Sequence, residues 1–165
     1  VGEASSAMKY LAEKGLDQLI CSLKQPVLGI CLGMQLMCAS SEENNTVCLG
    51  IFSEKVRLFP ATEGFKIPHI GWNDLTFPNK GRLFRGIEEH SYVYFVHSFY
   101  LEAADSSIVT ATTEYGARIH ASVEKDNIFA CQFHPEKSSR IGLKILQNFV
   151  DITKEYRDQH TQGGQ

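Results

Sequence analysis

The sequence has no long apolar run and no block of like charge. Its longest apolar stretch, residues 27–34, is far shorter than the roughly 18 residues that a membrane-spanning helix needs. Sixteen basic and nineteen acidic residues are interspersed, with a formal net charge of −3, which argues against a surface for nucleic acid or acidic lipid. Small molecules or other proteins are therefore the partners that we expect.

The sequence also has few signs of a disulfide framework or a metal site. Its five cysteines are an odd number and form no CxxC pair, which favours reduced thiols and a cytoplasmic protein. Its six histidines include no pair at the i, i+4 spacing of helical metal ligands. We therefore predict neither a metal ion nor a cofactor.

Composition and hydrophobic periodicity predict one α/β domain over residues 1–165. Apolar residues make up 43% of the chain and charged residues 21%, as in an ordinary globular protein. Hydrophobic periodicity predicts helices at 5–11, 16–23, 34–39 and 138–156, with a frayed tail at 159–165. It predicts strands at 27–30, 52–59, 70–75, 92–100, 108–114, 118–124 and 128–133. The middle strands form an antiparallel insertion between two strands of parallel type.

Residues 29–33 read Gly-Ile-Cys-Leu-Gly, the spacing of a nucleophile elbow between a strand and a helix. We expect Gly29 and Gly33 to be required because a side chain at either position would crowd the turn. Amides at the helix N-terminus would favour the thiolate of Cys31, and the N–H of Leu32 would donate to an oxyanion. A buried, inert thiol is the alternative, which we prefer for the other cysteines.

His134, Pro135 and Glu136 directly follow the apolar residues 128–133. In an extended segment residues i and i+2 share a face, so Glu136 would lie beside His134. We predict that His134 is the general base for Cys31 and that Glu136 orients its imidazole. A solvated histidine is the simpler interpretation of an isolated His-Pro-Glu, but the elbow favours the catalytic one. The two motifs alone fit an amidotransferase or another cysteine hydrolase.

Together these motifs resemble the class I, or triad, glutamine amidotransferases over nearly the whole chain. Residues 66–73 (Lys-Ile-Pro-His-Ile-Gly-Trp-Asn) and 94–98 (Tyr-Phe-Val-His-Ser) are similar to the glutaminase subunits of imidazole glycerol phosphate synthase. The resemblance implies a three-layer, flavodoxin-like α/β fold with a mostly parallel central sheet and an antiparallel side sheet. It implies that L-glutamine is hydrolysed through a Cys31 thioester. The ammonia would pass to a TIM-barrel cyclase subunit, in a heterodimer that makes imidazole glycerol phosphate and aminoimidazole carboxamide ribotide for histidine biosynthesis.

The resemblance also assigns residues to the substrate. Gln35 and Glu43 would surround the polar end of glutamine, with the Glu43 carboxylate facing the α-ammonium group. Tyr94, His97 and Ser98 would line the same pocket. A solvated helix end is the alternative for Glu43, a buried aromatic strand for Tyr94, and a structural or orienting histidine for His97.

By the same resemblance, Trp72, Asn73 and Lys137 would face the cyclase. A core position is the alternative for a lone tryptophan. Val1 and Gly2 resemble the final half of a Pro-Gly-Val-Gly loop, which in this family supplies the second oxyanion donor. We therefore expect a fragment that lacks N-terminal strands, with a weakened sheet and weak catalysis.

Two other interpretations of the chain stay open. One is a class I amidotransferase of another pathway, such as one serving pyridoxal phosphate or nucleotides, although residues 66–73 argue against it. The other is a catalytically inert binding or regulatory module that keeps the same fold.

Overall fold

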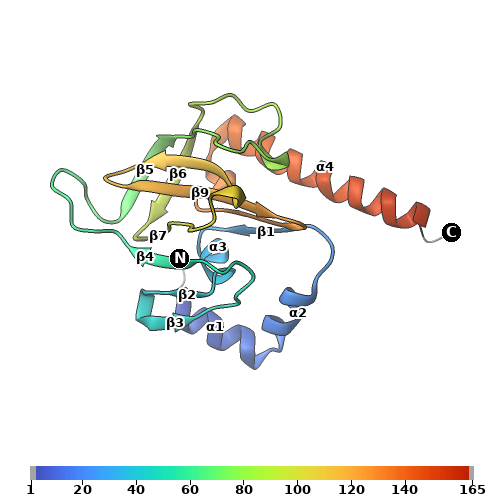
Figure 1. Ribbon diagram of the computed structural model, residues 1–165. Helices are drawn as coiled ribbons and strands as arrows, with labels where there is room; N and C mark the ends of the chain where they lie inside the picture. Colours follow the sequence, from blue (N-terminus) through green and yellow to red (C-terminus); the bar gives the residue numbers. More distant parts are fainter. Residues whose placement is uncertain (1–2, 164–165) are drawn as a thin grey trace.

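The computed structural model describes residues 3–163. Its helices are α1 (Ala4–Glu13), α2 (Leu16–Ser22), α3 (Leu32–Leu36) and α4 (Ser139–Gly163). Its strands are β1 (Val27–Ile30), β2 (Ser40–Ser41), β3 (Thr46–Val47), β4 (Lys55–Leu58), β5 (His69–Asp74), β6 (Tyr92–His97), β7 (Phe99–Leu101), β8 (Val109–Glu114), β9 (Arg118–Lys125) and β10 (Ile128–Cys131). Short 3-10 turns are η1 (Glu43–Asn45), η2 (Arg82–Phe84), η3 (Ser106–Ile108) and η4 (Pro135–Lys137). Figure 1 shows α4 above β1 and β9 and shows α1, α2 and α3 below β1.

The central sheet has the strand order β1-β10-β9-β8. β1 runs parallel to β10, with Ile30 opposite Cys131, whereas β9 is antiparallel to both of its neighbours. The antiparallel pairing of β9 and β10 follows from the short turn at Asp126 and Asn127 that joins them. The predicted α/β fold is confirmed, but over residues 3–163 the sheet is mixed and not mostly parallel.

Apolar clusters cover both faces of this sheet. Phe129 of β10 belongs to the same cluster as Ile145 of α4. Its neighbour Ala130 belongs to a second cluster, with Met34 of α3. Because successive residues of a strand point to opposite faces, a strand enclosed in this way is apolar throughout, and every residue of β10 is buried. This burial explains the continuous apolar run that precedes the His-Pro-Glu motif.

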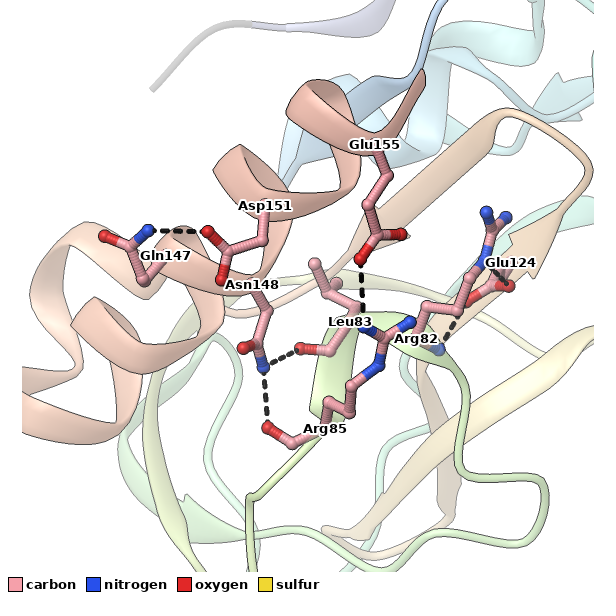
Figure 2. Close-up of polar contacts among 8 residues, drawn as sticks. All are labelled: Arg82, Leu83, Arg85, Glu124, Gln147, Asn148, Asp151 and Glu155. Carbon is pink, nitrogen blue, oxygen red and sulfur yellow. Dashed lines mark hydrogen bonds and ion pairs between the residues drawn. The ribbon is translucent and has the colours of Figure 1, made fainter. Parts of the chain in front are cut away.

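Polar contacts hold α4 against the η2 turn (Figure 2). The buried Asn148 side chain donates to the carbonyl oxygens of Leu83 and Arg85 at 2.9 and 2.8 Å. Buried carbonyl groups need such partners, so Asn148 stabilises the turn as well as the docking of the helix. Arg85 also pairs with Glu155 at 3.2 Å, but both side chains are exposed and the ion pair adds little.

Two smaller sheets, with the orders β3-β2-β4-β7 and β5-β6, complete the fold. In the β5–β6 hairpin, Trp72 lies opposite Tyr94 and His69 lies opposite His97. Alternation along the strands gives the hairpin a buried inner face, which contains both histidines, and an outer face on which Trp72 is 51% exposed.

The helix boundaries differ from the sequence predictions at three places. α1 begins before the predicted residue 5, because the Glu3 carboxylate caps it and accepts the N–H groups of Ser5 and Ser6. α3 lies earlier than the predicted helix at 34–39, since it begins directly after the elbow. α4 continues to Gly163 through the region predicted to fray. Among the described residues, no helix is both long enough and apolar enough to cross a membrane.

Candidate active site

Cys31 lies at the sharp turn between β1 and α3. Its φ of 55° and ψ of −109° are rare for a residue with a side chain. β10 holds one side of the turn, because the Cys31 N–H donates to the Cys131 carbonyl at 2.8 Å. α3 holds the other side, because the Gln35 N–H donates to the Cys31 carbonyl at 3.2 Å. The turn therefore has the strained geometry of a nucleophile elbow.

Of the two elbow glycines, only Gly29 lies where a side chain would collide with other atoms. A Cβ atom on Gly29 would lie 2.7 Å from Met37 Sδ and 3.0 Å from the carbonyl carbon of Gly33. A Cβ atom on Gly33 would have no other atom within 4 Å. The predicted crowding is confirmed for Gly29 and is wrong for Gly33, which faces open space.

The Cys31 thiol is buried, and burial favours its protonated form. Burial, and to a smaller extent the negative charge of Glu136, raises its pKa above the ordinary value of 9.0. Hydrogen bonds from the Leu32 N–H and the Gln132 amide lower the pKa and partly oppose this rise. The Leu32 N–H favours the thiolate, as predicted for the helix amides, but desolvation outweighs it because Cys31 is only 7% exposed. The thiol donates instead to the Val96 carbonyl at 3.7 Å.

His134 and Glu136 lie side by side, with 3.1 Å between Nδ1 and Oε2. Since Nδ1–H donates to the carboxylate, Nε2 of the neutral imidazole carries the lone pair. This Nε2 is buried and has no hydrogen-bond partner among the described residues. Ser138 steadies the turn, because its hydroxyl donates to the His134 carbonyl at 2.6 Å and accepts the Tyr94 N–H at 2.9 Å.

The parallel pairing of β1 and β10 brings the thiol and the imidazole to the same edge of the sheet. Cys31 follows β1 directly, and His134 follows β10 after Gln132 and Phe133. The side chain of Gln132, which precedes Phe133 and His134, contacts the Cys31 sulfur at 3.6 Å. The two groups are not hydrogen bonded to each other, since the thiol is directed to Val96 and Nε2 has no partner among the residues described. Proton transfer therefore requires the thiol to turn from the Val96 carbonyl toward Nε2.

A pocket of about 320 Å³ opens above the thiol. Its walls are formed by Cys31, Leu32, Gln35, Glu43, Pro68, Val96, His97, Ser98 and Phe99. Six of these residues are ones that the sequence placed at the site, whereas Tyr94 is not part of the wall. Within residues 3–163, no group of three or more His, Cys, Asp or Glu side chains is arranged to hold a metal ion.

Gln35 and Glu43 each use part of their hydrogen-bonding capacity inside the protein. Gln35 Nε2 donates to the Phe99 carbonyl and to Gln132 Oε1, both at 3.1 Å. Its own Oε1 is therefore the atom left to accept from a ligand. Glu43 Oε1 accepts the Ala4 N–H at the start of α1 at 2.7 Å, which leaves Oε2 for the pocket.

His97 is part of a buried histidine pair. Its Nδ1–H donates to the Phe99 carbonyl at 2.8 Å, so its Nε2 accepts from His69 Nδ1 at 2.9 Å. Burial lowers the pKa of His69 to about 4 and that of His97 to about 3. Both rings are therefore neutral, and both nitrogens of His97 already have hydrogen-bond partners, which favours a structural role for this ring in the pocket wall.

The residues assigned to the partner surface separate into two groups. Trp72 and Lys137 are exposed. Asn73 instead lies on the inner face of β5, where its side chain donates to the Glu114 carbonyl at 2.9 Å. Alternation along the strand explains this difference, because neighbouring residues point to opposite faces. Val1 and Gly2, assigned to the oxyanion site, lie outside the described residues.

Sequence reasoning missed the roles of Gln132, Ser138 and His69. Gln132 and Ser138 are fully buried polar residues on either side of His134, and a polar residue next to an apolar strand was the available signal. The contact of His69 with His97 had no local signal, because 28 positions separate the two residues in the chain.

Comparison with known proteins identifies the family of this site. Residues 6–152 match the model of the family described as glutamine amidotransferase class-I. The chain belongs to the class-I glutamine amidotransferases. A relative from Bacteroides thetaiotaomicron, "Imidazole glycerol phosphate synthase subunit HisH", is 49% identical over 153 residues, which span 92% of this chain and 76% of the relative. The protein with that name in Moorella thermoacetica is 45% identical over 93% of this chain and 74% of the relative.

Solved structures agree with this assignment at the level of the fold. This amidotransferase is similar to one subunit of a putative GMP synthase from Thermoplasma acidophilum, with a TM-score of 0.71 and 20% identity. The match covers 97% of this chain and 73% of the other. A second structure, described as a glutamine amidotransferase, gives a TM-score of 0.67 at 17% identity, over 93% of this chain and 76% of that one. The geometry around Cys31 thus lies within a glutamine amidotransferase fold.

Proposed function

We propose that this chain is the glutaminase subunit of an imidazole glycerol phosphate synthase and acts in histidine biosynthesis. The observation that carries the proposal is the strained Cys31 elbow, which lines a pocket at the sheet edge where β1 and β10, the strand that leads to His134, both end. The printed names of the two relatives described above support the pathway. We expect the protein to act in the cytoplasm, where its free cysteines stay reduced.

The reaction begins with transfer of the thiol proton from Cys31 to Nε2 of His134. The sulfur attacks the amide carbon of glutamine, and the N–H of Leu32 stabilises the oxyanion that forms. His134 then gives its proton to the leaving nitrogen as the carbon–nitrogen bond breaks, which releases ammonia and leaves a thioester on Cys31. Burial keeps the thiol protonated, so this step depends on the base.

The second half of the reaction hydrolyses the thioester and regenerates the free Cys31 thiol. His134 takes a proton from water while the water oxygen attacks the thioester carbon. The sulfur then leaves, recovers the proton from His134, and glutamate is released. Glu136 holds the tautomer of His134 and stabilises the imidazolium that forms in each half.

Gln35 and Glu43 explain why the pocket would select an amino acid. We propose that Glu43 Oε2 pairs with the α-ammonium group and that Gln35 Oε1 accepts a hydrogen bond from the substrate. Ser98 also lines the pocket, and we propose that it contributes to substrate binding. Val1 and Gly2 keep the proposed role of supplying the second oxyanion donor.

We propose that the TIM-barrel cyclase docks on the outer face of the β5–β6 hairpin. Ile70, Trp72 and Tyr92 expose 59%, 51% and 57% of their surface there, which is unusual for large apolar side chains on one face. Val96 follows on the same hairpin and lines the pocket, so the exposed face is continuous with the site. Ammonia that passes directly to the cyclase avoids protonation in bulk water. Exposed Lys137 would lie at the same entrance.

The experiment that tests the function uses Cys31→Ala in the complex with the cyclase. Glutamine hydrolysis should fall below detection, while imidazole glycerol phosphate synthesis from ammonium salts should continue at the wild-type rate. Cys21→Ala, which changes an exposed cysteine, is the matched control and should preserve both activities.

Other outcomes of this experiment favour the alternatives. If wild-type protein does not hydrolyse glutamine even with the cyclase, the chain is an inert module of the same fold. If it hydrolyses glutamine but fails to support the cyclase, the chain serves the amidotransferase reaction of another pathway.

A further inference from the structure

We infer that Gln132 is a further catalytic residue of this site: its side-chain amide donates a hydrogen bond to the Cys31 sulfur and stabilises the thiolate that attacks the substrate. The inference rests on the proposed glutaminase function and deepens it. The distance from Gln132 Nε2 to Cys31 Sγ is 3.6 Å, within the range of a hydrogen bond to sulfur.

A backbone carbonyl determines which end of the Gln132 amide faces the sulfur. The Phe99 carbonyl can only accept, so the Gln35 atom that lies 3.1 Å from it must be the nitrogen. The same nitrogen lies 3.1 Å from Gln132 and also donates there, so the Gln132 atom that it meets must be the oxygen. The remaining atom of the Gln132 amide is Nε2, and this donor faces Cys31.

Burial makes this chain of amides rigid and effective. Gln132 is fully buried and Gln35 is 5% exposed, so water does not compete for their hydrogen bonds. Phe99 begins β7 and is far from Gln132 in the sequence, yet the fold brings both into contact with the Gln35 side chain of α3. A buried amide is costly unless its groups are paired, and here the Gln132 oxygen and nitrogen both have partners.

The hydrogen bond matters most at the moment when the thiol loses its proton. At rest the thiol is neutral and donates to Val96, so the Gln132 N–H meets a weak acceptor. When His134 removes the proton, the sulfur becomes anionic and the same bond becomes charge-assisted. The donor is in place before the charge develops, which lowers the barrier without reorganisation. It also opposes burial and the nearby charge of Glu136, both of which raise the pKa of Cys31.

The test compares Gln132→Met with Ser122→Ala in the complex with the cyclase. Methionine keeps the length of the side chain and removes the donor. Ser122 is also fully buried, on the adjacent β9, and its hydroxyl donates to the Ala130 carbonyl at 2.7 Å without touching the sulfur. Iodoacetamide alkylation of Cys31 is measured against pH by peptide mass spectrometry, with exposed Cys21 as the internal reference.

In Gln132→Met, the pH midpoint of Cys31 alkylation should move upward and the rate near neutral pH should fall roughly tenfold, as expected for a lost hydrogen bond to a charged group. The kcat for glutamine should fall by a similar factor with KM unchanged, and Ser122→Ala should resemble wild type. A Cys31 profile and a kcat that both match Ser122→Ala would overturn the inference.

Two features keep this test decisive. If Gln132→Met yields no folded protein, Gln132→Asn takes its place with the same two outcomes, because its shorter amide does not reach the sulfur. Alkylation does not require glutamine, so a failure of the proposed glutaminase function can be distinguished from a failure of the inference about Gln132. In that case the wild-type complex lacks glutaminase activity while the alkylation profiles still show whether Gln132 acts on the thiol.

Discussion

The backbone N–H of Cys31 donates to the Cys131 carbonyl at 2.8 Å, which attaches the nucleophile to the strand that leads into the His-Pro-Glu turn. The turn is itself held by β6, because the His134 N–H donates to the Tyr94 carbonyl at 3.0 Å. Three segments far apart in the sequence therefore determine where the sulfur and the base lie. Changes that disturb any one of them should alter catalysis even when no catalytic side chain is changed.

Replacing the base should abolish most of the glutaminase activity. His134→Ala removes the group that takes the proton of a buried thiol, so kcat for glutamine hydrolysis should fall about 10³-fold or more. Steady-state kinetics of the cyclase complex give this value. His160→Ala is the control, because His160 is exposed near the end of α4. Equal losses in both variants would contradict the role of His134.

Adding a methyl group at Gly142 of α4 should disturb the His-Pro-Glu turn, against which this part of the helix packs. A Cβ atom there would overlap the Pro135 carbonyl oxygen, so α4 or the turn must shift. We expect Gly142→Ala to lower the free energy of unfolding by about 1–3 kcal/mol and to reduce kcat. Denaturant unfolding measures the first effect, with Gly33→Ala as a control that meets no atom within 4 Å. If Gly33→Ala loses more stability than Gly142→Ala, crowding by the Pro135 carbonyl is not the reason that position 142 requires glycine.

The buried histidine pair should make the protein less stable in acid. Burial lowers the pKa of His69 to about 4 and that of His97 to about 3, whereas both titrate near 6.5 when unfolded. Between these pKa values the unfolded chain binds more protons than the folded protein. The contribution of the two neutral histidines to the free energy of unfolding is therefore fully present above pH 6.5 and decreases as the pH falls. Burial lowers the pKa of His120 as well, which acts in the same direction.

Denaturant unfolding at about pH 7 and about pH 5 measures this decrease. His69→Gln removes one of the titrating rings, so its stability should depend less steeply on pH than that of wild type. His160→Gln is the control, since His160 is exposed near the end of α4. If His69→Gln and wild type lose stability equally on acidification, the pair is not the source of the pH dependence.

The exposed face of the β5–β6 hairpin should be needed for assembly. Trp72→Ala removes a large apolar side chain from its centre and should weaken cyclase binding by about 2 kcal/mol, or roughly 30-fold in Kd. Isothermal titration calorimetry measures the affinity. Leu143→Ala removes an apolar side chain that is 69% exposed on α4 and should bind normally. Binding that is weakened by the α4 variant and unaffected by Trp72→Ala would place the partner on another face.

The sequence was sufficient to predict features that depend on local geometry. The elbow at Cys31 and the pairing of His134 with Glu136 follow from chain conformation over a few residues. The sign of the Cys31 pKa shift could not be predicted, because it depends on burial by distant segments. The contacts of Gln132 and His69, and the open space beside Gly33, likewise depend on which segments meet in three dimensions.

The most direct test of the central claim is covalent labelling with an electrophile that mimics glutamine, in the presence of the cyclase. We expect one adduct, on Cys31, which forms in wild-type protein and is lost or greatly slowed in His134→Ala. No adduct on Cys31, or labelling of exposed Cys21 in its place, would contradict the claim that Cys31 and His134 act together on glutamine.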